Sequence, residues 1–238
     1  MEAESRKKIQ IALALVIAVA AARAGYIVYD RYQERKADET PKQEVALKAD
    51  YYVMPRKLYP YDLKSAQELT RQPVWVKVGY GYTYYPYDPA RRKTDFGHEA
   101  GTLPPLQKLQ IAEVILDHAP DSPGSQQVMA RFDLDGKPFA VQVGTRQGQE
   151  FKFYCNDIFF IQDPHELYKH WRPEIWNAID RREVQPGMNE LQVGFALGMV
   201  TAQSGDRQGA HSLTYRNGDK PMTVTFQGDK AVEIKQGS

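Results

Sequence analysis

The sequence predicts an α+β protein with an N-terminal transmembrane helix, a small β-barrel-like domain, and a final domain of two helices and three strands. Three observations predict it: an apolar run near the start, apolar residues at every second position in the middle, and well-marked helix starts followed by alternating strands near the end. The expected parts are a membrane anchor at 1–29, a charged linker at 30–50, the barrel-like domain at 51–163 and the α/β domain at 164–238.

The N-terminal run is long enough for a membrane span. From Ile9 to Tyr29 it is interrupted only by Gln10 and Arg23, and at a rise of about 1.5 Å per residue it covers about 31 Å, which matches a hydrocarbon core. Basic residues 6–8 precede it and favour an N-terminus that stays inside. We therefore expect a single-pass protein of the cell membrane whose soluble part is periplasmic or otherwise extracytoplasmic.

Two other interpretations of this run remain open. Ala22-Arg23-Ala24 before Gly25 has the form of a cleavage site, which would make the segment a removable signal peptide. The second open interpretation is that the run forms a buried core helix. Continuation of the run through Tyr26 and Tyr29, with tyrosines placed as interface anchors, favours the uncleaved anchor. Both the anchor and the signal peptide export the rest of the chain.

The composition excludes several classes of function. Lys and Arg number 31 against 30 for Asp and Glu, so no net field attracts nucleic acid and we expect no nucleic-acid partner. Cys155 is the single cysteine, which excludes an internal disulfide framework and a Cys-based zinc site. Between 30 and 50 the charges alternate in sign and apolar residues are few, which is typical of a stalk.

The block at 51–163 has the pattern of short strands. Apolar residues alternate from Val74 to Tyr84, which predicts one strand with a bend or bulge at Gly79 and Gly81. Asp135-Gly136 predicts a tight hairpin turn. The other strands are expected at Leu106–Leu116, Gln127–Leu134, Phe139–Val143, Phe151–Tyr154 and Ile158–Ile161. With its Leu103-Pro104-Pro105-Leu106 entry, the block resembles a Src-homology-3-like barrel.

The block at 164–238 begins with helix signals. Asp163 is expected to cap a short helix from Pro164 to Trp171, and Pro173 opens a second helix. Asn189 and Gln192 have the spacing of a capping box, and Gly198 falls where a left-handed C-terminal residue is expected. Three strands are then expected at Leu213–Tyr215, Met222–Phe226 and Val232–Ile234, with turns at Asn217-Gly218 and Gly228-Asp229.

This order carries a family resemblance. The pattern Val184-x-x-Gly187-Met188-x-x-x-Gln192-Val193-x-x-x-Leu197-Gly198, with the closing strands Thr223–Phe226 and Ala231–Ile234, resembles the SmpA/OmlA domain. That is the fold of the small lipoprotein of the outer-membrane β-barrel assembly machine, and β-lactamase-inhibitor proteins share it. The resemblance implies an envelope domain that works through protein–protein contact without a cofactor.

Residues that suggest chemistry have simpler explanations. Cys155 as a nucleophile would need His165, His170 or His98 as its base, but its aromatic neighbours are typical of a buried strand. His165 and His170 are five residues apart and do not share a helix face, so they do not form an i, i+4 zinc pair. Asp133–Gly136 lacks the ligands of a calcium loop. We therefore expect no catalytic residue, no cofactor and no metal.

The tyrosines form the remaining candidate site. Tyrosine offers contact area, a polar tip and little rotamer entropy, which suits grooves for peptides or glycans. The candidate binding surface consists of Tyr80, Tyr82, Tyr84, Tyr85 and Tyr87. The alternative is that these alternating residues form the barrel core.

These observations predict a non-catalytic, membrane-tethered envelope protein that binds or scaffolds other envelope proteins. The alternative is a peptidoglycan- or glycan-binding module that uses the tyrosine surface. The expected partners are an envelope protein or peptidoglycan, together with the membrane through the N-terminal helix.

Overall fold

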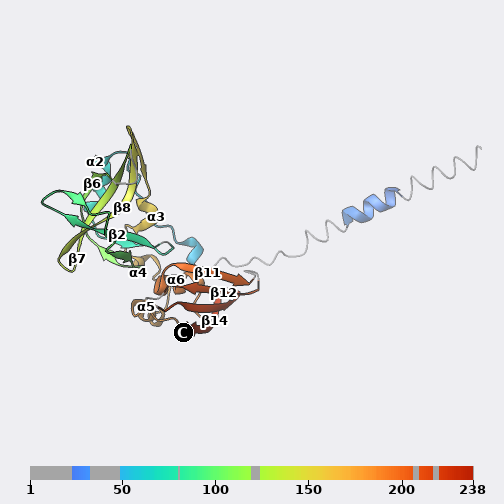
Figure 1. Cartoon of the computed structure of the whole chain (residues 1–238). Helices are drawn as coiled ribbons and strands as arrows, with labels where there is room; N and C mark the ends of the chain where they lie inside the picture. The colour runs from blue at the N-terminus through green and yellow to red at the C-terminus, as the bar shows by residue number, and fades with distance from the viewer. Residues whose placement is uncertain are drawn as a thin grey trace, which may run out of the picture. The chain divides into compact units, whose positions relative to one another are not determined.

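The computed structural model describes residues 23–32, 49–79, 81–118, 124–205, 209–216 and 220–237 (Figure 1). The chain divides into two compact units, Met1–Lys48 and Ala49–Ser238. In the first unit, residues 23–32 are helical and expose Tyr26 and Val28. Within the described ranges, no helix combines the length and apolar character needed to cross a membrane. Most of the predicted anchor, at 1–22, and most of the predicted linker, at 33–48, lie outside these ranges.

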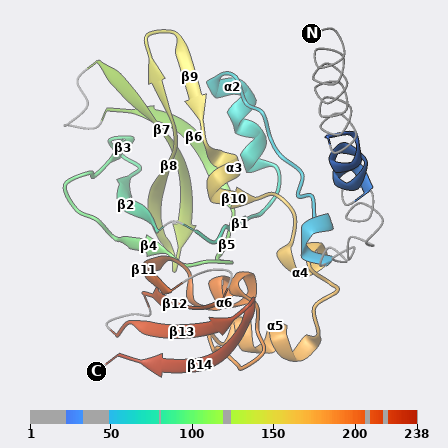
Figure 2. The ribbon, with the colours of Figure 1, turned by 90° about the vertical axis from the view of Figure 1, so that its right-hand side faces the viewer.

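The second unit is mixed α+β, as predicted, and its larger sheet curls into a half-barrel (Figure 2). The strand order is β3-β2-β8-β7-β6, with β4 paired to β2 and β9 paired to β8. Its interior is filled by alternating apolar residues of these strands, including Phe132 and Val141, which are almost fully buried. The strands are β2 (Tyr82–Asp88), β3 (Lys93–Thr94), β4 (Gly101–Leu103), β6 (Ile111–Asp117), β7 (Ser125–Leu134), β8 (Lys137–Gln147) and β9 (Glu150–Phe153).

Short helices complete this core. The 3-10 helix η1 (Ala49–Tyr52) begins the unit, and α2 (Leu63–Ala66) continues into η2 (Gln67–Thr70), which contacts β6. The helix α3 (Cys155–Ile158) contacts β8. The predicted hairpin is confirmed: Asp135 and Gly136 join β7 to β8 with φ values of 52° and 75°, the positive φ pair that a type I′ turn requires.

A three-stranded sheet of order β10-β1-β5 lies between two hydrophobic cores. It consists of β1 (Val74–Val76), β5 (Lys108–Leu109) and β10 (Phe159–Phe160). Because side chains alternate across a strand, Val74 and Val76 belong to the first core while Trp75 packs against the second. Phe159 and Phe160 divide in the same way. The two cores therefore share one sheet.

Two predicted strands are each divided in the structure, so these two predictions are wrong in extent. The expected strand 74–84 becomes β1 and β2, because Gly79 has a φ of 133° and Val78 turns to pack against the second core. The bend expected at the glycines is confirmed. The expected strand 106–116 becomes β5 and β6, and Leu106, with a φ of 60°, lies in a turn instead.

The second core lies between helices and a four-stranded antiparallel sheet (Figure 2). Asp163 caps the first helix, as predicted, by accepting a hydrogen bond from the N–H of His165, but this helix ends at Leu167 and not at Trp171 as expected. The capping box of Asn189 and Gln192 is also confirmed, with N–H···O distances of 2.9 and 2.8 Å. The elements are α4 (Pro164–Leu167), α5 (Pro173–Asp180), α6 (Glu190–Leu197), β11 (Val200–Gly205), β12 (Ala210–Tyr215), β13 (Met222–Gln227) and β14 (Lys230–Gln236).

The sheet has a strand that the sequence analysis did not predict. The expected three-stranded meander corresponds to β12, β13 and β14, with the turn at Gly228 confirmed, and β11 adds a fourth strand at the edge. All six residues of β11 are exposed, so no buried face produces an apolar alternation. Gly198 has the expected positive φ, 90°, but its ψ of −130° leads the chain directly into this strand. The expected turn at Asn217-Gly218 lies outside the described residues.

Candidate functional site

The structure separates the predicted tyrosine surface. Tyr82 and Tyr84 pack against the first core, whereas Tyr85 and Tyr87 lie on the opposite face of β2, around Met129. Tyr80 lies outside the described residues. The pleat of one strand thus divides these side chains between two packed faces, and a binding role for them stays a prediction.

The residues considered for catalysis are not brought together. Cys155 is buried, as expected, but at the start of the helix α3 rather than in a strand. Its burial raises the pKa of the thiol, which favours the poorly nucleophilic protonated form. The three histidines each contact carboxylates elsewhere: His98 contacts Asp95, His165 contacts Asp163 and Asp180, and His170 contacts Asp50. Among the residues with described positions, no group of three or more His, Cys, Asp or Glu side chains could hold a metal ion.

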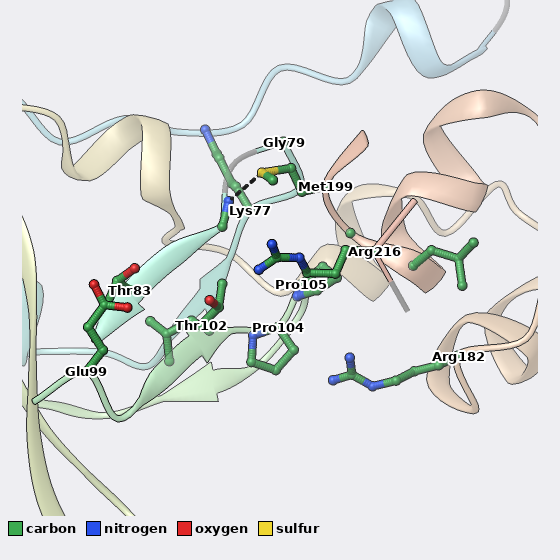
Figure 3. Close-up of a pocket in the computed structure, with 14 residues that line it drawn as sticks. Lys77, Gly79, Thr83, Glu99, Thr102, Pro104, Pro105, Arg182, Met199 and Arg216 are labelled. Atoms are coloured by element: carbon green, nitrogen blue, oxygen red, sulfur yellow. Dashed lines mark hydrogen bonds between the residues drawn. The ribbon is translucent and has the colours of Figure 1, made fainter. Parts of the chain in front are cut away.

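A cleft of about 320 Å³ lies between the curled sheet and the four-stranded sheet (Figure 3). One wall comes from the chain around Gly81, from β4 with Thr102, and from the Pro104-Pro105 turn. The other wall comes from the end of α6, Met199 and two arginines that follow α5 and β12. Its volume lies at the lower end of the range of about 300–1,000 Å³ that is usual for ligand pockets. We refer to this space as the interlobe cleft.

Two arginines give the interlobe cleft its positive charge. Arg182 and Arg216 are both exposed, and neither forms an ion pair with another described residue. Figure 3 shows both guanidinium groups directed toward the space faced by Thr102 and Pro104. Glu99 stands at the far side of the same space. The two guanidinium groups face one carboxylate, an arrangement suited to binding an anionic group of a ligand.

Arg182 occupies a backbone position that normally favours glycine. It follows α5 with a φ of 58°, its N–H donates to the carbonyl of Ile179, and the next N–H, of Glu183, donates to the carbonyl of Ala178. These two bonds form a Schellman motif, whose left-handed residue is usually glycine. An arginine there accepts backbone strain of about 1 kcal/mol. The strained turn is what presents the Arg182 side chain to the cleft.

Lys77 lines the cleft, but its ammonium group is directed away from the space that the two arginines face (Figure 3). Its ammonium group donates to the carbonyl oxygen of Asn156 and lies 5.0 Å from the centroid of the Phe160 ring. Desolvation by burial lowers the pKa of Lys77, with the opposing effect of Asp157 second. The side chain is therefore a structural contact beneath the cleft wall.

Two close contacts, each made by a glycine backbone with a side chain of the opposite part, fix the width of the cleft. The N–H of Gly81 donates to the sulfur of Met199 at 3.3 Å, which joins one wall to the other. A Cβ atom on Gly194 of α6 would lie 2.9 Å from Cγ1 of Val78, closer than real Cβ contacts allow. The absence of a side chain at Gly194 lets the curled-sheet part approach α6 closely.

The edge strand β11 begins at the cleft, directly after Met199. Its inner edge pairs with β12, and in the described part of the sheet no strand pairs with its outer edge. Its sequence, Val-Thr-Ala-Gln-Ser-Gly, has no charged residue and no proline. The exposed strand β11 thus begins beside two arginines that form no ion pair with another described residue.

A second cluster holds the start of the folded unit to the second core. The carboxylate of Asp50 accepts hydrogen bonds from Trp171 Nε1 at 2.6 Å and from Asn189 Nδ2 at 2.8 Å, and it contacts His170 Nε2 at 2.5 Å. The Asp50 side chain is only 17% exposed. Sequence reasoning placed Asp50 in the charged linker, because nothing local distinguishes it from the neighbouring charges.

The arginines of the cleft were missed for a similar reason. Arg182 follows a helix and Arg216 follows a strand, and each looks like an ordinary surface cation in the sequence. Only the packing of α5 and β12 around one core brings them to the same space. The one available signal was an arginine, rather than glycine or asparagine, after the end of a predicted helix.

Comparisons with protein-family models, curated proteins and solved structures gave no match to this chain.

Proposed function

We propose that this chain is a non-catalytic binding protein, tethered to a membrane by its N-terminal segment, that binds or scaffolds another envelope protein through the interlobe cleft. The observation that carries the proposal is that two exposed arginines, Arg182 and Arg216, line one cleft without an ion pair to another described residue. Guanidinium groups without an ion pair supply recognition of an anionic group rather than bond-making chemistry.

The finer architecture belongs to the same proposal. The segment 9–29 acts as the transmembrane helix, the curled sheet corresponds to a small barrel-like domain, and the remainder corresponds to an SmpA/OmlA-like domain. The order of α5, α6 and an antiparallel sheet supports this relationship. Here the sheet has β11 as an additional strand. Because a fold alone does not define a function, the proposed role rests on the cleft.

Exposed tyrosines favour one second candidate, the binding of peptidoglycan or another glycan. Tyr52, Tyr59 and Tyr61 lie in the segment before α2 and are 66%, 79% and 78% exposed. Amphipathic rings on an extended segment offer broad faces with polar tips. In this case the glycan would bind away from the cleft arginines.

Site-specific photo-crosslinking in the full-length, membrane-tethered protein tests the proposal. A photoreactive residue at Thr102, on the cleft wall, should crosslink to a discrete protein, and the crosslink should weaken when Arg216→Glu is added. A photoreactive residue at Lys137, in the exposed hairpin, is the matched control and should give no such product. No crosslink at Thr102, with sedimentation on purified peptidoglycan that is lost in Tyr59→Ser/Tyr61→Ser, would favour the glycan candidate.

A further inference from the structure

One short segment carries most of the apolar surface that the folded unit exposes. Residues 52–61, which we call the tyrosine strap, run from the end of η1 to α2 (Figure 2). Among the described residues of Ala49–Ser238, six large hydrophobic side chains are exposed, and the strap holds four of them, Tyr52, Met54, Tyr59 and Tyr61. The other two, Val200 and Val232, lie on separate strands. Such a concentration of apolar side chains is typical of an interaction surface.

The backbone of the strap is held to the unit although it lies outside the regular strands. The N–H of Arg56 donates to the side-chain oxygen of Gln162 at 2.8 Å. Further along, the side chain of Asn156 accepts from the N–H of Leu58 at 2.9 Å and donates to the carbonyl oxygen of the same residue. The Leu58 side chain is buried in the first core. The exposed side chains therefore stand on a fixed backbone, which reduces the conformational entropy that binding costs.

Cations accompany the exposed rings. Arg56 and Lys57 lie within the strap, Lys64 lies in α2, and all three are exposed. The only carboxylate in this stretch is that of Asp62, which caps α2 by accepting a hydrogen bond from the N–H of Ser65 at 2.7 Å. Tyrosine rings beside Lys and Arg suit the headgroup region of a bilayer, where the rings meet the acyl boundary and the cations meet lipid phosphates.

We infer that the tyrosine strap binds the surface of the same bilayer that anchors the chain, with Tyr59 and Tyr61 at the acyl boundary and Arg56 and Lys57 at lipid phosphates. The inference rests on the membrane tether of the proposed function and adds a second membrane contact, which the folded unit makes. The residues of the strap do not line the interlobe cleft, which stays the proposed site for a protein partner.

The length of chain between the proposed anchor and the strap favours a bilayer as the occupant. The charged segment at 30–48 joins the two, and a chain of that length reaches at most about 65 Å when fully extended. Such a tether keeps the strap at an effective concentration on the order of millimolar at the bilayer surface. A weak interfacial affinity, which a few rings and cations provide, is then sufficient.

The shape and chemistry of the strap are less suited to a glycan. Ligand sites are usually concave and combine apolar walls with convergent polar groups. The nearby cavity of about 330 Å³ is lined by Arg56, Trp75 and Glu166 among others, and not by the strap tyrosines. Met54, which is 85% exposed, offers a sugar hydroxyl only a weak acceptor, whereas burial of its apolar side chain in lipid is favourable.

Depth measurement by electron paramagnetic resonance tests the inference on the full chain reconstituted in vesicles of phosphatidylcholine and phosphatidylglycerol. A nitroxide label at Tyr59→Cys should collide more often with oxygen, which concentrates in lipid, than with a water-soluble nickel complex. A label at Lys137→Cys, at the exposed hairpin between β7 and β8, is the matched control and should show the reverse. Cys155 is buried, so the wild type should take up no label.

Removal of the rings tests which side chains hold the strap to lipid. With the label at Met54→Cys, the change Tyr59→Ser/Tyr61→Ser should lower the ratio of oxygen to nickel collisions about twofold or more, because two rings leave the bilayer. Val232→Ser removes an exposed apolar side chain from β14 and should leave the ratio unchanged. An equal ratio in all three proteins would overturn the assignment of the tyrosines.

The cations have a separate test. Arg56→Glu/Lys57→Glu should shift the label at Met54→Cys toward water in vesicles that contain phosphatidylglycerol, because the strap would then repel the anionic lipid. Lys93→Glu/Lys152→Glu makes the same charge change on exposed residues of β3 and β9 and should have no effect. Equal shifts in the two variants would overturn a contact between the strap cations and lipid phosphates.

The outcomes separate the inference from the proposed function. A label at Tyr59→Cys that is as open to nickel as the hairpin label, in a chain that stays embedded in the vesicles, would overturn the inference and leave the tether standing. Extraction of the chain from the vesicles by alkaline carbonate would overturn the tether and, with it, the inference. Protection from nickel that appears only when peptidoglycan is added would assign the strap to the glycan candidate. Protection that rises with the ratio of protein to lipid would assign it to a second copy, and either result would overturn the inference.

Discussion

The indole of Trp171 donates a hydrogen bond of 2.6 Å to the carboxylate of Asp50, across 121 positions of sequence. Asn189, the N-cap residue of α6, and His170, in the segment after α4, contact the same carboxylate. One aspartate at the start of the folded unit thus contacts three polar side chains from two separate segments. Trp171 also stacks on Tyr168 at 4.6 Å between centroids, so the bond fixes an aromatic cluster of the second core.

Asp50→Ala should destabilise the protein substantially. The indole N–H and the Asn189 amide would lose their acceptor at a largely buried position, and each buried polar group left without a partner costs about 1–3 kcal/mol. We expect the free energy of unfolding in urea to fall by about 2 kcal/mol or more. The control is Asp133→Ala, whose carboxylate is 59% exposed and 3.7 Å from Arg131. It should change stability by less than about 0.5 kcal/mol, and equal effects would contradict the role of Asp50.

Gly194→Ala should destabilise the contact between α6 and the curled-sheet part. The new methyl group would meet Cγ1 of Val78 at 2.9 Å, and Val78 has little freedom to move because its side chain is β-branched. Overpacking of about 1–3 kcal/mol outweighs the gain of up to about 1 kcal/mol in helix propensity.

A double-mutant cycle checks this explanation. In a Val78→Ala background the obstructing methyl group is absent, so Gly194→Ala should become neutral or stabilising in thermal or urea unfolding. If Gly194→Ala costs as much in that background as in the wild type, steric contact with Val78 is not the cause.

Tyr154→Phe should protect the protein from alkaline unfolding. Burial raises the pKa of Tyr154 from 10.0 to about 12 in the folded state. A raised folded-state pKa gives stability that is complete below the unfolded pKa and is lost as pH rises toward the folded value, because the unfolded tyrosine ionises first. Between pH 10 and 12 the wild type should lose on the order of 2 kcal/mol more than Tyr154→Phe. Tyr59→Phe, at an exposed position, is the control and should follow the wild-type pH profile.

Arg182→Gly should weaken binding of the partner without lowering the stability of the fold. Glycine adopts the left-handed conformation of the Schellman position without strain, so stability should stay the same or rise by up to about 1 kcal/mol. Crosslinking from Thr102 should nevertheless decrease, because one guanidinium is removed from the cleft. A loss of folding stability comparable to the loss of crosslinking would contradict a binding role for Arg182.

Local signals in the sequence predicted local structure well. The hairpin at Asp135-Gly136, the capping box of Asn189 and Gln192 and the cap at Asp163 each depend on residues close together in sequence, and each is confirmed. The α+β class follows from the same signals. The N-terminal span, the family resemblance and the partner remain predictions.

What the sequence did not predict depends on contacts distant in sequence. The strand β11 has no buried face, so periodicity carries no information about it. The alternation from Val74 to Tyr84 continued through Gly79, although the chain there passes from one core to the other. The cleft needs Arg182 and Arg216, which come together only through the packing of their elements.

The three-stranded sheet between the two cores has a consequence for how this protein can be divided. A cut after residue 163 would expose Trp75 and Phe160 on one fragment and remove one wall of the core of the other. Neither piece would keep its full apolar burial, so recombination or truncation at this point should yield aggregation-prone fragments rather than portable modules. We therefore expect the barrel-like part and the helical part to be inherited together, as one unit.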